Sequence, residues 1–129
     1  MATRASALPA LVAVSVALLA GVAVADDGPD SGVRGRVTVS PTCPVQRPGE
    51  QCYAGYETKI RITVLPERIH AKTIQTGEHG YFRTELPPGR YRLRPRGGKN
   101  GFPACPSRDV TVKSGRFTRV GIDCDTGIR

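Results

Sequence analysis

The chain has 129 residues, and its 19 lysines and arginines outnumber its 11 acidic residues, which gives a formal net charge of +8. This length fits one small domain and excludes a second domain of ordinary size. The basic balance favours anionic partners such as wall polymers or lipid head groups.

The first 25 residues have the three parts of a secretory signal peptide. Arg4 precedes an uncharged apolar run at residues 10–19, and the small residues Ala23 and Ala25 fit a cleavage site. We therefore expect cleavage after Ala25 and a secreted or extracytoplasmic protein of the cell envelope, whose net charge falls to +7 with the loss of Arg4. The alternative is an uncleaved N-terminal membrane anchor, because residues 8–25 carry no charge.

The rest of the chain divides into a short leader and one domain. Residues 26–32 are acidic and rich in turn-forming residues, so we expect a flexible leader. Residues 33–129 alternate apolar and polar side chains over short stretches, and no stretch has helical spacing. The expected strands are 33–39, 57–65, 69–75, 81–86, 90–96, 109–113 and 116–123. This pattern predicts an all-β fold, a single seven-stranded Greek-key sandwich.

Four of these strands are expected to pair as two hairpins. In the first, Phe82 and Leu86 face the core, a Pro-Pro-Gly turn follows, and Tyr91 and Leu93 continue the core face. In the second, the turn lies at residues 114–115. Two loops rich in Pro and Gly, at residues 41–51 and 97–107, interrupt the strand pattern.

Four cysteines in an exported chain of this size indicate two structural disulfides. Three pairings are possible. We favour Cys43 with Cys52 and Cys105 with Cys124, because the members of each pair are close in sequence. A metal site is not expected, since the histidines stand alone and no Cys-x-x-Cys motif occurs. No cofactor is expected either.

One stretch of the domain resembles the carboxypeptidase regulatory-like domains, which belong to the transthyretin-like and Cna-B-like group of β-sandwiches. The residues that carry the resemblance are Thr76, Gly80, Phe82, Leu86, Pro87, Pro88, Gly89, Tyr91 and Leu93. Where the family usually has Asp after the Thr, this chain has Gly77. Residues 41–44, early in the domain, and residues 125–129, at its end, also resemble small exported bacterial proteins that carry this domain. The resemblance implies a transthyretin-like or Ig-like sandwich that acts as an accessory module and not as an enzyme.

Four arginines, Arg90, Arg92, Arg94 and Arg96, alternate along one expected strand and are the candidate binding residues. They would project from one face about 7 Å apart, and guanidinium groups suit phosphate or carboxylate. We expect an anionic envelope polymer or a protein as partner, no nucleic acid, no stable membrane insertion after cleavage, and a monomer. The alternative is that these charges only solvate an edge strand, in a purely structural envelope protein.

Two other functions would use other residues of the domain. A carbohydrate-binding, starch-binding-like module would need exposed rings, for which Tyr53, Tyr56, Tyr81 and Phe102 are the candidates. Residues 125–127 spell the Asp-Thr-Gly of aspartic proteases, but only two residues follow, and we expect no catalytic residue.

Overall fold

The computed structural model describes residues 30–129, and this part of the chain contains strands and no helix. The expected signal peptide and most of the expected leader lie outside the described residues. The leader ends earlier than expected, because Ser31 is only 2 % exposed and its hydroxyl donates a hydrogen bond to the carbonyl of Leu86. Within residues 30–129 no helix has the length and apolar character needed to cross a bilayer.

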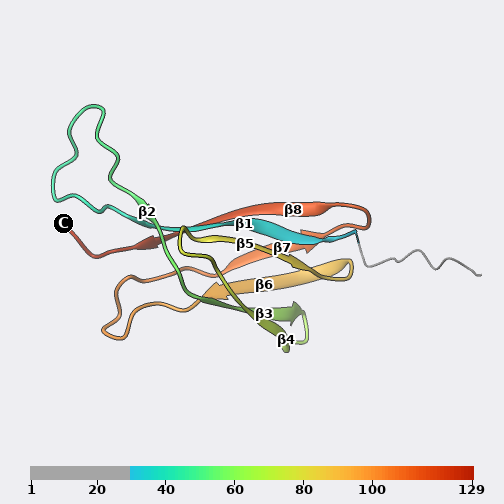
Figure 1. The fold of residues 1–129 in the computed structure, drawn as a ribbon. Helices are drawn as coiled ribbons and strands as arrows, with labels where there is room; N and C mark the ends of the chain where they lie inside the picture. Colours follow the sequence, from blue (N-terminus) through green and yellow to red (C-terminus); the bar gives the residue numbers. More distant parts are fainter. Residues whose placement is uncertain (1–29) are drawn as a thin grey trace, which may run out of the picture.

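The strands form two sheets that face each other across a shared core, as in a β-sandwich (Figure 1). The eight strands are β1 (Gly32–Ser40), β2 (Ala54–Gly55), β3 (Lys59–Leu65), β4 (Ile69–Gln75), β5 (Tyr81–Glu85), β6 (Gly89–Pro95), β7 (Arg108–Val112) and β8 (Phe117–Asp125). In sheet A, β1 pairs with β8 in parallel and with β5 and β2 in antiparallel orientation. Sheet B has the antiparallel order β4-β3-β6-β7.

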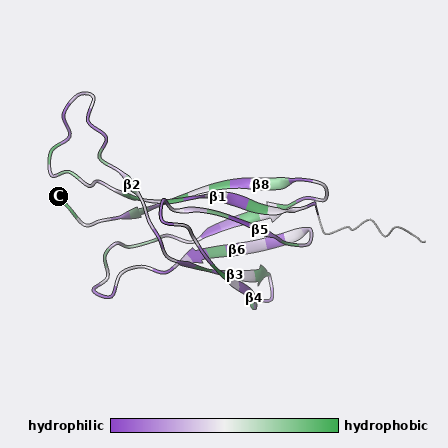
Figure 2. Cartoon of the chain, viewed as in Figure 1, coloured by the Kyte–Doolittle hydropathy of each residue, from purple (hydrophilic) through white to green (hydrophobic). Residues whose placement is uncertain are grey.

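Alternation within the strands builds the core, as the sequence predicts. Val33 and Val37 of β1 are fully buried, and so are Ile60 and Ile62 of β3. Figure 2 shows the corresponding alternation of apolar and polar segments along the ribbon. Because side chains at every second position share a face, each sheet keeps one apolar face for the core and one polar face for solvent.

The two predicted hairpins are wrong, although their strands exist. β5 pairs with β1 in sheet A, whereas β6 pairs with β3 and β7 in sheet B. In the same way, β7 belongs to sheet B and β8 to sheet A. Pro87 and Pro88 lack the N–H groups that ladder pairing needs, and the chain crosses from one sheet to the other through them. Alternation fixes which side of a strand is buried but does not choose its neighbour.

Two buried side chains hold connections between the two sheets in place. The ring of Tyr91 is buried and its hydroxyl donates to the carbonyl of Pro87 at 2.6 Å, and burial raises the pKa of this phenol. Thr76 is 1 % exposed; its hydroxyl accepts the N–H of Thr58 at 2.8 Å and donates to the carbonyl of Tyr56 at 2.9 Å. Each side chain satisfies backbone groups that no sheet ladder pairs.

Both predicted disulfides are confirmed, and they indicate an oxidising compartment. Cys43 and Cys52 have Cα atoms 5.3 Å apart and close the loop between β1 and β2. Cys105 and Cys124, with Cα atoms 4.2 Å apart, join the loop after β6 to β8 across the sandwich. These two loops and the C-terminus extend from the same end of the molecule (Figure 1).

Candidate functional site

The four candidate arginines lie on sheet B. Arg90, Arg92 and Arg94 alternate along β6 with the buried Tyr91 and Leu93, so they occupy the outer face of the sheet. Arg96 follows the last residue of β6, where its N–H donates to the carbonyl of Lys59. The outer face is solvated, and the arginines therefore remain available to a ligand.

The neighbouring strand adds further positive charge beside three of these arginines. Lys59 and Arg61 come from β3, and Arg68 comes from the turn between β3 and β4. Together with the β6 side chains they line a shallow groove of about 700 Å³. We call this the basic groove; its lining is Lys59, Arg61, Thr63, Arg68, Thr73, Arg92, Arg94, Pro95, Arg96 and Gly97. Arg90 lies on the same strand but outside the groove.

Like charges are placed directly opposite each other in the basic groove. In the register of β3 and β6, Arg61 is the cross-strand partner of Arg94. Such a pair destabilises a sheet slightly, because opposed side chains of one face lie only about 5 Å apart at Cβ. An anion bound between these two side chains would remove the repulsion.

One acidic residue pairs with the basic groove among residues 30–129. Asp109 of β7 accepts two hydrogen bonds from the guanidinium of Arg92, at 2.7 Å from Nε and 3.1 Å from Nη2. The hydrogen bond with Arg92 holds the pKa of Asp109 below its ordinary value, and it raises that of Arg92. At neutral pH Asp109 is therefore ionised and masks one of the six cations of the groove.

Arg68 stands in a backbone conformation that its side chain disfavours. Its φ is +63°, and it is the one non-glycine residue with positive φ among the described residues. For L-residues other than Gly, Asn and Asp this conformation costs about 1–2 kcal/mol. Glycine would suit the turn better, and what arginine adds at this position is a cation on the rim of the groove.

Sequence reasoning missed Lys59, Arg61 and Arg68 as members of the site. Alternation already places Lys59 and Arg61 on the outward side of their strand. Only the pairing of β3 with β6 shows that they stand beside the arginine stripe, and that pairing is not encoded in either strand alone.

The rings considered for carbohydrate binding do not form a platform. Tyr53, Tyr81 and Phe102 are exposed, but Tyr56 is partly buried against the core. Tyr53 lines a depression near the end of β1, Tyr81 lies on sheet A, and Phe102 packs against Gly127. The three exposed rings thus lie in three different places.

Asp125 is occupied by its own neighbours. Its carboxylate accepts the N–H of Gly127 at 2.9 Å and forms an ion pair with Arg129, also at 2.9 Å. The hydrogen bond from Arg129, followed by that from Gly127, lowers its pKa. In a catalytic pair of carboxylates that share one proton, the pKa of one carboxyl group is raised. The pKa of Asp125 is lowered instead, so this geometry gives no support to protease chemistry.

Within residues 30–129 the histidines and cysteines do not gather into a site with free metal ligands. Cys43, Cys52 and Glu50 lie close together, but the two sulfurs are joined in a disulfide. His70 hydrogen-bonds to Thr73, and His79 lies beside Glu78 on the surface.

Comparison with known proteins adds no relative: no protein-family model matches the chain, and no curated protein matches it at a significant level.

Proposed function

We propose that this protein is an exported, non-enzymatic binding module that holds an anionic envelope polymer, or an acidic protein segment, in the basic groove of sheet B. The observation that carries the proposal is the clustering of six basic side chains from β3, β6 and the β3–β4 turn around one groove, with a single acidic partner. Guanidinium groups recognise phosphate and carboxylate with two parallel hydrogen bonds, which suits a repeating anion.

The shape of the groove supports an extended ligand. It is shallow and follows two neighbouring strands of one sheet, so a polymer can lie across it without entering a closed cavity. Arg61 and Arg94 stand opposite each other, and a phosphate or carboxylate between them would contact both. The two disulfides support export of the protein to an oxidising compartment.

We also propose that the fold is the Greek-key sandwich of the transthyretin-like group and that the domain is a carboxypeptidase regulatory-like module. Two observations support this. The segment from Leu86 to Leu93 runs between the two sheets, and Tyr91 returns its hydroxyl to Pro87. In such a module the groove would serve binding and not turnover.

The test is co-sedimentation of the oxidised protein with purified envelope fractions at low salt and at about 0.5 M salt, where charge attraction is screened. The test variant is Arg61→Gln with Arg94→Gln, which removes two charges from the groove and relieves a like-charge pair. The matched control is Lys113→Gln with Arg116→Gln, which removes two exposed charges from the turn between β7 and β8, outside the groove.

We expect salt-sensitive sedimentation that the groove variant loses and the control variant keeps. Equal loss in both variants would show that net charge, not the groove, causes the attraction. Sedimentation that neither salt nor the groove variant changes would contradict the proposal and leave the arginines as solvating charges.

A further inference from the structure

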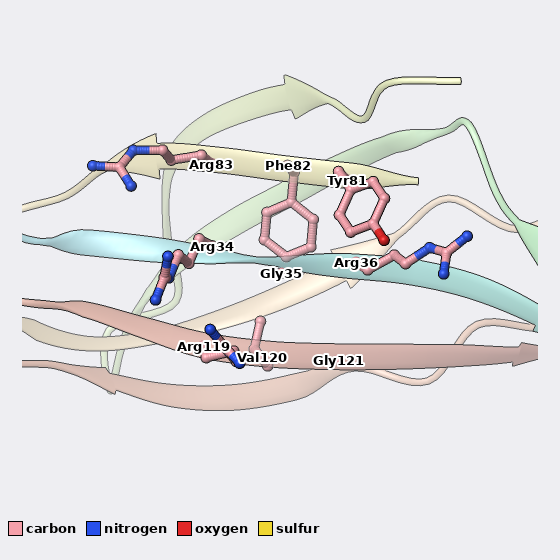
Figure 3. A pocket seen from close by; sticks show the side chains of 9 residues that line it. All are labelled: Arg34, Gly35, Arg36, Tyr81, Phe82, Arg83, Arg119, Val120 and Gly121. Carbon is pink, nitrogen blue, oxygen red and sulfur yellow. The ribbon is translucent and has the colours of Figure 1, made fainter. Parts of the chain in front are cut away.

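The outer face of sheet A carries a second depression, of about 560 Å³, with a different chemistry (Figure 3). Three arginines form one straight row across its strands, because Arg34 of β1 is the partner of Arg83 on β5 and of Arg119 on β8. The next outward row consists of Tyr81, Arg36 and Gly121. The floor between the rows is apolar, formed by Gly35, Phe82 and Val120, but these residues hold core-facing positions and Phe82 is only 7 % exposed.

Two glycines keep this depression open, and they do so for different reasons. At Gly35 a Cβ atom would overlap the backbone oxygen of Val120, so close packing of the strands requires glycine. At Gly121 a Cβ atom would meet nothing within 4 Å, and the backbone is not in the left-handed region. Glycine weakens a strand interior, and it often marks a bulge, a bend or a site where a ligand or another backbone approaches closely. No other part of the described chain approaches the Cβ position of Gly121, which leaves room there for a ligand.

The charges around this depression have no acidic partner. Within residues 30–129, none of Arg34, Arg36, Arg83 and Arg119 makes an ion pair. Two of them are held in place by rings: Arg36 stacks on Tyr81 at 4.8 Å and Arg83 on Phe117 at 3.7 Å from the ring centroid. A row of like charges on adjacent strands opposes folding, and a bound anion would offset it.

Figure 3 shows how the two chemistries are separated. The guanidinium groups of Arg34, Arg83 and Arg119 gather at one end, Arg36 points away at the other, and the rings of Phe82 and Tyr81 lie between. Rows two residues apart along a strand are separated by about 7 Å. A ligand that spans the two rows therefore meets three cations at one end and, at the other, the open space over Gly121 next to the stacked pair of Arg36 and Tyr81.

We propose that this face binds a small amphipathic anion, with its sulfate, phosphate or carboxylate on the row Arg83, Arg34 and Arg119 and its flat apolar body over Gly121, next to Arg36. A hydrated polyanion would gain nothing from the apolar floor, whereas a neutral apolar molecule would leave the arginines without a partner. This site is independent of the basic groove, which lies on the outer face of the other sheet.

The test uses naphthalene-2-sulfonate, whose ring system and anionic group match this spacing, and follows its titration by amide chemical shifts. Sulfate and 2-naphthylmethanol supply the anion and the apolar body separately. Gly121→Val fills the open space in which the apolar body would lie. Because a valine side chain fits this space and valine favours strands, the variant is expected to fold with an equal or higher melting temperature. Arg119→Gln removes one end of the row, and Lys113→Gln, in the turn between β7 and β8, is the control outside both sites.

We expect shifts on β1, β5 and β8, with at least tenfold weaker binding of sulfate and of the alcohol. Gly121→Val should weaken binding at least tenfold, Arg119→Gln several-fold, and Lys113→Gln not at all. Equal affinity for sulfate and naphthalene-2-sulfonate would overturn the proposal, as would unchanged binding by Gly121→Val.

Discussion

Replacing Asp109 with Asn should strengthen binding of a polyanion, because it releases Arg92 into the basic groove. In the native protein Asp109 holds Arg92 with two hydrogen bonds, and the net charge of the six groove cations with this one acid is +5. The substitution raises it to +6. One added phosphate contact steepens the dependence of log K on log salt by about 0.7–0.9. If the native protein and the variant bind equally at 1 M salt, the variant should bind about fivefold more tightly than the native protein at 0.15 M salt.

The assay is a titration with polyphosphate of defined length at several salt concentrations. Asp123→Asn is the matched control, since Asp123 is an exposed carboxylate on sheet A that accepts hydrogen bonds from Thr38 and Ser40. Both variants gain one unit of net charge, but only one of them gains it in the groove. A similar gain for Asp123→Asn would refute the reasoning, as would weaker binding by Asp109→Asn.

The pH dependence of this difference follows from the lowered pKa of Asp109. The carboxylate stays ionised, and keeps masking Arg92, at every pH well above its ordinary value of 3.8. Its pairing with Arg92 is lost only as the pH falls through the lowered folded-state pKa. The gain from Asp109→Asn should therefore be the same at pH 7 and pH 5.

Two further predictions concern stability and are read from denaturant unfolding. Removing the Cys105–Cys124 disulfide by paired substitution to Ala should lower the free energy of unfolding by about 3.2 kcal/mol, against about 2.6 kcal/mol for Cys43–Cys52. The difference arises because the sequence separations are 19 and 9. An equal or larger loss for the shorter loop would contradict this account. Thr76→Val should cost about 2–4 kcal/mol because it strands two buried backbone groups, while Thr76→Ser keeps the hydroxyl and should cost much less.

Alternation and cysteine spacing were enough to predict seven of the eight strands, their buried sides and both disulfides, but not the two-residue strand β2. Val33, Ile60, Leu93 and Ile122 are buried where the period of two requires. The pairing partner of each strand could not be predicted in this way. After Pro87 the chain can form a hairpin with the strand before it or cross to the facing sheet, and the same side of each strand is buried in both cases.

For the same reason, only part of the candidate site could be predicted from the sequence. Arg92 and Arg94 follow from alternation within one strand, but Arg61 and Asp109 join them only through the register of β3, β6 and β7. The arginine row on sheet A depends likewise on three strands that are far apart in sequence, with β1 in parallel to β8. Cross-strand neighbours are a property of the fold, and a single strand does not contain them.

The most direct test of the basic groove is to map the amide chemical shifts of the oxidised protein during a titration with polyphosphate. The proposal predicts that the shifts concentrate on β3, on β6 and on the turn that contains Arg68, and that they fade as salt is raised. Shifts confined to β1, β5 and β8, or spread evenly over both sheets, would contradict it.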